Sequence, residues 1–539
     1  MARSILAGTL CVGALATVGG VTLGTLDAAP AAASSVTVTG AGSSYAAVAI
    51  DQWVAQVASI DGININYSTS SSVIGLNEFA AQQIDFGASE IGYSTNQANQ
   101  TPTGSSIPYQ YMPDVAGAEC LMFNVTSQTS QQIQNLDLTP AVVEGIFSGT
   151  ITSWNDPQLT ALNPSALLPN EPINVVYRED ASGDNYIFSD YLDTLEPSAF
   201  TAFESAVGSP SGPTAIWPIP GNGNRVGQYN LSAWIGQNGS DNSSNYVYGN
   251  EGTITYVETA YAILHHDPCA AIQNVSGAWV TPSRDADAEA LINDQLAPDL
   301  EQNLTGVFES PQPTAYPISA YSYIVSEEGQ MNAAKGLVLG QFVMYLACSG
   351  QNAAGELGYS PLPPNLVQDD FQAVARIAGN QGANAPPSQP TAANCKNPYV
   401  DGSIPLIGEP VVQGQATTTT TAPTGGTTAT TAPSAGGGTS SGGGGGGSVT
   451  VVQGSSGAAS GPVSAVGSTT HAAKGPTTAA APGQIPGLAL TAARDQLLGV
   501  PAPLLRSVLI TALLVGLLCV PPLVAVVRRR RRRREEAVP

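Results

Sequence analysis

One short segment combines the residue types that bind an oxyanion. Residues 175–185 read Val-Val-Tyr-Arg-Glu-Asp-Ala-Ser-Gly-Asp-Asn, the pattern of a strand that passes through a turn of small residues into a helix. Arg178 precedes Ser182 and Gly183, which open that helix, where free backbone N–H groups and the helix dipole favour a negative charge. Positive charge is scarce here, because residues 34–415 hold six Lys or Arg against 36 Asp or Glu. We therefore interpret Arg178 as part of an anion site.

Two other segments, 43–45 (Ser-Ser-Tyr) and 70–72 (Ser-Ser-Ser), also place serine in a turn directly before a helix. Each serine hydroxyl can donate to an anion, and each helix start offers unpaired N–H groups. Taken alone, each serine is better interpreted as an ordinary N-cap. Three such segments together with a scarce arginine favour an oxyanion site.

Glu90 is an unexpected residue for such a site, because a carboxylate repels an anion unless a proton lies between them. Phosphate near neutral pH can carry that proton, and Glu90 could then accept a hydrogen bond from it. Fully ionised sulfate has no proton to give, and it would leave an acceptor unpaired at a cost of about 1–3 kcal/mol. The simpler alternative is that Glu90 is a surface acid.

Three motifs carry a resemblance to a known family. They are Gly-Ala-Gly-Ser-Ser-Tyr at 40–45, Asp-Phe-Gly-Ala-Ser-Glu at 85–90 and Arg-Glu-Asp-Ala-Ser-Gly at 178–183. In this order they resemble the ligand segments of the periplasmic phosphate-binding protein of bacterial phosphate ABC transporters. Further similar segments are 151–156, 162–164, 252–261 and 358–364. The resemblance covers residues 36–367.

The resemblance implies a set of phosphate ligands in this chain. They are Ser44, Tyr45, Ser72, Glu90, Arg178, Ser182, Gly183 and Asp184. It also implies that Asp180 holds the guanidinium of Arg178 as a bidentate partner.

The chain departs from the family pattern at three points. Glu90 stands where the family has an Asp that accepts the phosphate proton, which changes the acceptor geometry. Asp184 stands where many members have Thr, so a hydroxyl donor is lost. Its carboxylate either adds repulsion or turns outward and leaves only its amide on the ligand. Val73 and Ile74 replace small residues, and they either crowd the pocket or stiffen the helix start.

The folded unit is expected to span residues 34–412 with α/β architecture, because strand-like runs alternate with helical periodicities. The resemblance implies a two-lobed periplasmic-binding-protein fold of type II with a hinge. One lobe would comprise residues 36–116 and 314–407, and the other residues 117–313. Closure around the anion would create the state that a permease recognises.

The ends of the chain predict export and anchoring. Residues 1–33 resemble a signal peptide with an Ala-Ala-Ala cleavage site, although an uncleaved anchor is the alternative. Residues 413–486, rich in Thr, Gly, Ser and Ala, predict a disordered stalk that could be O-glycosylated. Residues 507–527 carry no charge and predict a transmembrane helix. The basic tail 528–539 would then be cytoplasmic.

Four cysteines fall within the expected folded unit: Cys120, Cys269, Cys348 and Cys395. Their even number in an exported chain favours two disulfides, with three pairings open. Zinc binding is the weaker alternative, because the chain has no Cys-x-x-Cys motif and three histidines. We expect a monomer without a cofactor, a metal or a nucleic-acid partner.

The expected function is an extracytoplasmic phosphate receptor that delivers its ligand to ABC permease subunits. A phosphatase is less favoured, because no activated nucleophile or metal cluster is evident. A cell-surface phosphate sensor or interaction protein on the same fold fits the stalk and anchor. A receptor for another oxyanion is the third alternative, and Glu90 would decide it.

Overall fold

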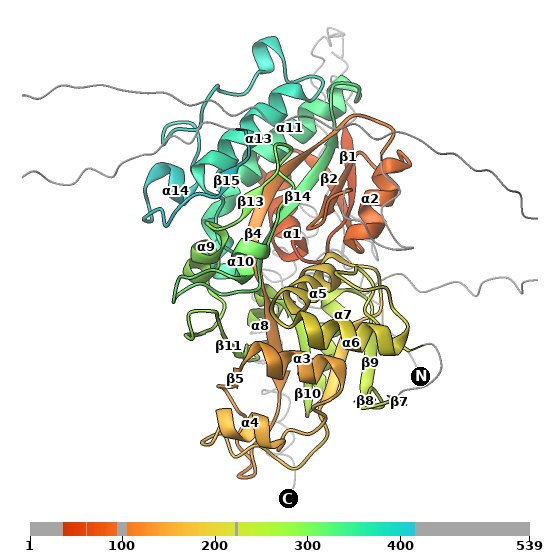
Figure 1. The fold of residues 1–539 in the computed structure, drawn as a ribbon. Helices are drawn as coiled ribbons and strands as arrows, with labels where there is room; N and C mark the ends of the chain where they lie inside the picture. Colours follow the sequence, from red (N-terminus) through yellow and green to blue (C-terminus); the bar gives the residue numbers. More distant parts are fainter. Residues whose placement is uncertain (1–35, 61, 94–104, 221–224, 415–539) are drawn as a thin grey trace, which may run out of the picture. The chain divides into compact units, whose positions relative to one another are not determined.

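The computed structural model describes residues 36–60, 62–93, 105–220 and 225–414. The predicted signal peptide 1–33, nearly all of the stalk 413–486, the membrane segment 507–527 and the tail 528–539 lie outside these residues. The described chain belongs to one compact unit. Helices and strands alternate along it (Figure 1), so the predicted α/β class is confirmed.

The strands are β1 (Thr37–Gly42), β2 (Asn64–Thr69), β3 (Phe86–Ser89), β4 (Tyr109–Asn124), β5 (Asp137–Leu138), β6 (Asn174–Arg178), β7 (Arg225–Val226), β8 (Tyr229–Asn230), β9 (Trp234–Gln237), β10 (Thr253–Glu258), β11 (Ala271–Gln273), β12 (Trp279–Val280), β13 (Gln295–Leu296), β14 (Ser319–Glu327) and β15 (Val411–Val412). The helices are α1 (Ala47–Ile60), α2 (Ser72–Ala80), α3 (Pro140–Ser148), α4 (Pro157–Leu162), α5 (Gly183–Leu195), α6 (Pro197–Val207), α7 (Gly239–Gly249), α8 (Thr259–His265), α9 (Arg284–Leu291), α10 (Thr305–Phe308), α11 (Ala333–Ala347), α12 (Ala354–Leu357), α13 (Pro364–Arg376) and α14 (Pro398–Asp401), with 3-10 helices η1 (Ser349–Ala353) and η2 (Gly382–Asn384).

The central sheet has eight strands in the order β2-β1-β3-β14-β4-β10-β6-β9. Strand β4 is long and changes partner along its length (Figure 1): up to Ala118 it pairs with β14, and from Glu119 it pairs with β10. The strands β1, β2 and β3 are parallel in the first half of the sheet, and β10, β6 and β9 are parallel in the second. Ligands of open α/β sheets bind outside the carboxyl ends of such parallel strands.

Helices α1 and α5 follow the apolar periodicity of the sequence. In α1 the buried residues Ile50, Trp53 and Val57 recur with helical spacing and face the core. In α5 the buried face consists of Ile187, Phe188, Tyr191 and Leu192. Both helices begin at the carboxyl end of a parallel strand, α1 after β1 and α5 after β6. The two strands run in opposite directions, because β4 is antiparallel to both β14 and β10. The starts of α1 and α5 therefore face each other where the two halves of the sheet meet.

One stretch of the described residues, Ala333–Leu357, is long and apolar enough to cross a membrane, with a mean hydropathy of 1.2. Half of its most apolar 18-residue part is buried within the folded unit. Leu339, Phe342 and Val343 of α11 lie in the core, and α11 packs against α13. The place of α11 in the domain core therefore accounts for the length and apolar composition of this stretch.

The four cysteines form two disulfides, Cys120–Cys269 and Cys348–Cys395. The first joins β4 to the loop after α8 in the second half of the sheet. The second ties the end of α11 to the loop before α14. They close segments of 149 and 47 residues.

The two disulfides are predicted to differ in their effect on the free energy of unfolding. Loop-closure entropy makes loss of the longer Cys120–Cys269 link about 1 kcal/mol more destabilising than loss of Cys348–Cys395. Urea unfolding of the two double Cys→Ala variants checks this, and each variant serves as the control for the other. Equal losses, or a larger loss for Cys348–Cys395, would contradict the prediction.

Candidate functional site

The guanidinium of Arg178 is the centre of a buried polar cluster. Arg178 ends β6 and is 1% exposed. Its Nε and Nη2 donate to the two carboxylate oxygens of Asp180 at 2.7 and 2.5 Å, and Asp180 also accepts from the Gly239 backbone N–H at 3.0 Å. Burial alone would lower the pKa of Arg178, but the charges of Asp180 and Glu258 raise it above its ordinary value. Arg178 is therefore a fixed positive charge.

The remaining Nη1 of Arg178 brings three distant segments together. It donates to Ser44 Oγ and to Ser240 Oγ, each at 3.0 Å, and forms an ion pair with Asp184. Ser44 lies in the turn before α1, Asp184 in the first turn of α5, and Ser240 in the first turn of α7. The hydroxyls of Ser44 and Ser240 lie 2.8 Å apart. One guanidinium thus connects three helix starts.

Glu90 is buried directly after β3, so it is not a surface acid. The hydroxyls of Ser43 and Ser72 donate to its two carboxylate oxygens, and Ser322 Oγ donates to one of them at 3.4 Å. Burial raises the pKa of Glu90, while these serine hydrogen bonds and the charge of Arg178 lower it in part. The carboxyl therefore retains a proton more readily than a solvated one.

Gly183 brings the start of α5 against this carboxyl. Its backbone N–H donates to Ser72 Oγ at 3.1 Å. A Cβ at this position would overlap the Glu90 carboxylate and approach Ser72 Oγ to 2.9 Å. Only glycine allows the starts of α2 and α5 to approach so closely.

The serines divide between capping and contact with the charged groups. Ser182 caps α5 by accepting from Asn185 N at 3.1 Å, and Ser71 caps α2 by accepting from Ile74 N at 3.4 Å. Ser43 combines both roles, because its hydroxyl also accepts from Ala46 N at 3.0 Å. For Ser182 the hydroxyl thus has the ordinary N-cap role that was weighed from the sequence.

Tyr45 does not direct its hydroxyl at Arg178 or Glu90. Its ring lies in the core, and its Oη donates to the Ala320 carbonyl at 3.4 Å. The turn that contains it is held by three other tyrosines. Tyr67, Tyr261 and Tyr359 donate to the carbonyls of Ser43, Ser44 and Tyr45 at 2.6, 3.0 and 2.6 Å, respectively. Each carbonyl of the turn thus has its own support.

Two departures from the family pattern have a definite geometry here. Asp184 is 1% exposed and points inward to Arg178, so its side chain does not turn outward. Val73 packs in the core, whereas Ile74 is 43% exposed. Ile74 therefore does not crowd the cluster.

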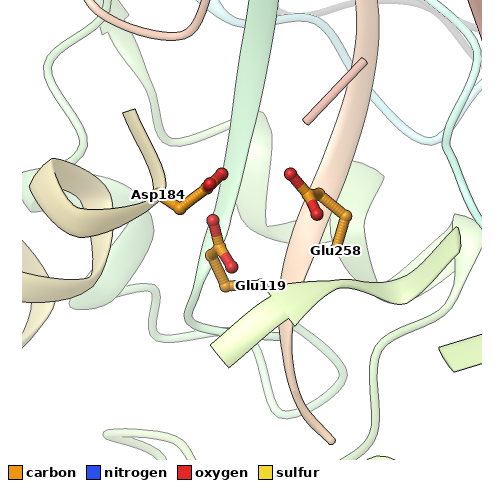
Figure 2. Close-up of side chains that lie close together, drawn as sticks. All are labelled: Glu119, Asp184 and Glu258. Atoms are coloured by element: carbon orange, nitrogen blue, oxygen red, sulfur yellow. The ribbon is translucent and has the colours of Figure 1, made fainter. Parts of the chain in front are cut away.

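Two carboxylates that sequence reasoning missed lie beside Asp184. Glu119 of β4 and Glu258 of β10 are directly paired across the sheet, and both are fully buried. Oxygens of Glu119, Asp184 and Glu258 lie within 4.8 Å of one another, and Figure 2 shows the three carboxylates facing a common space. Burial raises the pKa of Glu258 to about 7 although Arg178 lowers it, and burial with the charge of Glu258 raises the pKa of Glu119.

Ser240 was also missed, although the sequence carries a signal for it. Asn-Gly-Ser-Asp at 238–241 places a serine at a helix start, as in the three segments chosen from the sequence. Glu258 lies in segment 252–261, which resembles the family but in which no residue was predicted to belong to the site. Glu119 is one of two acids in the largely apolar strand β4, the other being Asp114, and such residues indicate a buried charge with a function or a partner.

The comparisons with known proteins identify the family of the chain. Residues 27–348 match the model of the PBP superfamily domain. The phosphate-binding protein PstS of Xylella fastidiosa is 30% identical over 334 residues, which cover 62% of this chain and 84% of that protein. The chain belongs to the PstS family of phosphate-binding proteins. The resemblance inferred from the motifs is therefore confirmed.

Other similar proteins are less alike in sequence. Phosphate-binding protein PstS 3 of Mycobacterium leprae is 28% identical over 339 residues, covering 60% of this chain and 80% of that protein. The crystal structure of a phosphate-binding protein from Stenotrophomonas maltophilia is 21% identical with a TM-score of 0.44, covering 70% of this chain and all of that one.

Gly183→Ala is predicted to destabilise the fold, because the added methyl overlaps the Glu90 carboxylate. Overpacking of this kind costs about 1–3 kcal/mol of unfolding free energy. The matched control is Gly249→Ala at the end of α7, where an added Cβ meets nothing within 4 Å. That change should be neutral or stabilising by up to about 1 kcal/mol. Urea unfolding measures both, and equal stability of the two variants would contradict the prediction.

Proposed function

We propose that this chain is an extracytoplasmic receptor that binds inorganic phosphate and delivers it to the permease subunits of an ABC transporter. The observation that carries this proposal is the cluster in which one buried arginine and one buried carboxyl join four helix starts, those of α1, α2, α5 and α7. Membership of a family whose members are named phosphate-binding proteins supports the ligand class. Its relatives are named for phosphate binding and not for a reaction, which supports a role other than catalysis.

The ligand set proposed for phosphate combines donors with one acceptor. Arg178 supplies the charge, and Asp180 orients its guanidinium by two hydrogen bonds. The hydroxyls of Ser44 and Ser72 and the backbone N–H of Gly183 would donate to phosphate oxygens, exchanging for them the partners inside the cluster that they have in this structure. Ser182 and Tyr45 would contribute through the backbone, because their side chains have other partners. Asp184 completes the set predicted from the sequence.

Glu90 is proposed to share one proton with phosphate. If phosphate brings the proton, Glu90 accepts the hydrogen bond. If Glu90 holds it, dibasic phosphate accepts it, and the raised pKa of Glu90 makes this form accessible. Either way, one hydrogen bond joins two groups that would otherwise repel each other. Sulfate brings no proton, so only the second form could bind it.

The two halves of the sheet suggest how the site could open and close. The proposed lobes are residues 36–116 with 314–407, and residues 117–313. The lobe boundary at 116–117 falls close to where β4 exchanges β14 for β10. Contacts such as Arg178–Ser44 and Gly183–Ser72 join residues of different lobes. We propose that they belong to the closed state that the permease recognises.

The export signal 1–33, stalk 413–486, membrane helix 507–527 and cytoplasmic tail 528–539 remain part of this proposal, with the domain as a monomer at the cell surface. A second candidate is a receptor for another oxyanion, and the inward carboxylate of Asp184 favours it, because it replaces a donor by an acceptor. A surface sensor on the same fold would bind the same ligand. Phosphate uptake by cells lacking the chain would separate sensor from transporter.

Arg178→Ala should weaken phosphate binding by at least about 100-fold, because it removes the only positive charge in the described cluster and leaves the buried carboxylates uncompensated. Calorimetry of the purified chain with phosphate, arsenate and sulfate measures this. Arg284→Ala is the control, because Arg284 pairs only with the exposed Asp285 among the described residues and should leave affinity unchanged. If Arg178→Ala misfolds, Arg178→Lys keeps the charge but loses the bidentate fork, and it should bind more weakly.

No heat from phosphate, arsenate or sulfate with the unmodified chain would refute the proposed function. Heat that is unaffected by Arg178→Ala and by Arg178→Lys would place the site elsewhere.

Glu90→Gln should reduce the preference for phosphate over sulfate. The amide presents a fixed N–H donor to either anion, so sulfate no longer leaves an acceptor unpaired. The difference is about 1–3 kcal/mol, which is roughly 5- to 150-fold in the affinity ratio. Competition between sulfate and phosphate, followed by calorimetry, checks this. Glu251→Gln, at an exposed position, is the control. An unchanged ratio in Glu90→Gln would remove Glu90 from the selectivity mechanism.

A further inference from the structure

The polar cluster contains far more acid than one arginine can neutralise. Five buried or nearly buried carboxyls, those of Glu90, Glu119, Asp180, Asp184 and Glu258, belong to it. Arg178 is the single cation among them in the described residues. Placing a further anion in this environment is strongly unfavourable if all five carboxyls are ionised. Phosphate binding here therefore requires that additional positive charge enters.

The hydrogen-bond pattern shows where that charge is missing. Among the described residues, neither oxygen of Glu119 has a partner, and one oxygen each of Asp184 and Glu258 is also unpaired. All three residues are at most 1% exposed. The other Glu258 oxygen accepts from Ser240 Oγ at 3.0 Å. Buried carboxylate oxygens without donors are costly, and a proton on a neighbouring carboxyl would convert an acceptor into a donor.

A proton suits this place better than a metal ion. The ion pair of Arg178 with Asp184 borders the space between the carboxylates, and Arg178 Nη1 lies 3.0 Å from the Ser240 hydroxyl that contacts Glu258. A divalent cation would be repelled by this guanidinium. Carboxyls held close together, by contrast, share protons because they cannot all ionise.

We propose that Glu119, Asp184 and Glu258 are a proton-holding wall of the anion site, and that phosphate binding takes up protons there in addition to the one shared with Glu90. A protonated carboxyl of this wall donates an O–H, either to its neighbour or to phosphate. Asp184 would thereby regain the donor that Thr supplies in many family members. This inference rests on the proposed function and identifies the residues that determine its dependence on pH.

The other titratable groups that surround this wall do not supply the proton. Arg178 and Asp180 are locked in their ion pair, and Glu90 serves the other face of the site. The surrounding tyrosines are buried and their pKa values are raised by burial, so they stay neutral; they are Tyr45, Tyr256, Tyr261, Tyr316 and Tyr359. Asp287 is also buried, and burial raises its pKa.

The sign of the effect follows from the raised pKa of Glu258. Below about pH 7 the free protein already holds the proton, and binding is strong. As the pH rises above about 7, the free protein loses the proton and must recover it on binding. Affinity then falls by about tenfold per pH unit for each proton taken up.

The test is calorimetry of the purified full chain with inorganic phosphate, at about pH 8 in buffers of different ionisation enthalpy, which gives the number of protons bound. The unmodified chain should take up more protons than Glu258→Gln by about one per phosphate. Because glutamine imitates the neutral acid, Glu258→Gln should also keep its affinity as the pH rises. Glu119→Gln is the second variant, and Glu251→Gln, at an exposed position, should behave as the unmodified chain does.

Three results would overturn the inference. One is proton uptake that is unchanged in both Glu258→Gln and Glu119→Gln. Another is loss of affinity in these variants by the same factor at every pH, which indicates a structural role only. The third is affinity that depends on added Ca²⁺ and is abolished by a chelator, which indicates a cation in this wall. Absence of phosphate binding by the unmodified chain at any pH would instead refute the proposed function.

Discussion

The burial of a single guanidinium is the constraint on which the rest of this structure depends. A buried charge costs several kcal/mol unless it is paired and all its N–H groups are satisfied. Arg178 meets this requirement with Asp180 and Asp184 from its own half of the sheet and with the hydroxyls of Ser44 and Ser240. No short stretch of sequence holds all these partners. Both halves of the sheet must therefore be in place before all of these partners reach the arginine, so the complete site exists only in the assembled fold.

The turn that opposes Arg178 is made rigid by a different device. Three consecutive carbonyls, those of Ser43, Ser44 and Tyr45, each accept a hydrogen bond from a buried tyrosine hydroxyl. The donors come from β2, α8 and the segment after α12. A turn held by three separate elements keeps its backbone N–H groups in place, which reduces the entropy that an anion must overcome on binding. Tyr261 lies in α8, directly after β10, the strand that pairs with the second part of β4. Its hydrogen bond to the Ser44 carbonyl therefore joins the turn to the second half of the sheet.

Features that depend on residues close together in the chain could be predicted from the sequence. Helical spacing identified the buried faces of α1 and α5, and serine at a helix start identified the turns that meet at the cluster. The Arg178–Asp180 ion pair joins residues only two positions apart, so it too could be predicted. Glu119 and Glu258 could not be found in this way, because strand register alone makes them neighbours, and register is decided by packing across the sheet. The disulfide pairing was open for the same reason, and Ser240 was overlooked because its segment carries no apolar periodicity.

The acidity of this chain opposes anion binding less than its net charge implies, because the effect of each charge depends on its distance from the site. The whole chain carries a formal charge of −23, but charges farther away than a Debye length of about 8 Å are largely screened in physiological salt. The carboxyls that matter are therefore the few in contact with Arg178, and they are buried where screening is weak. There the balance between donors and acceptors decides the ligand. Each proton held by a carboxyl both removes a negative charge and adds a donor, whereas a lysine in the same place would fix the charge at every pH. A wall of carboxyls thus gives an anion site whose strength follows the acidity of its surroundings.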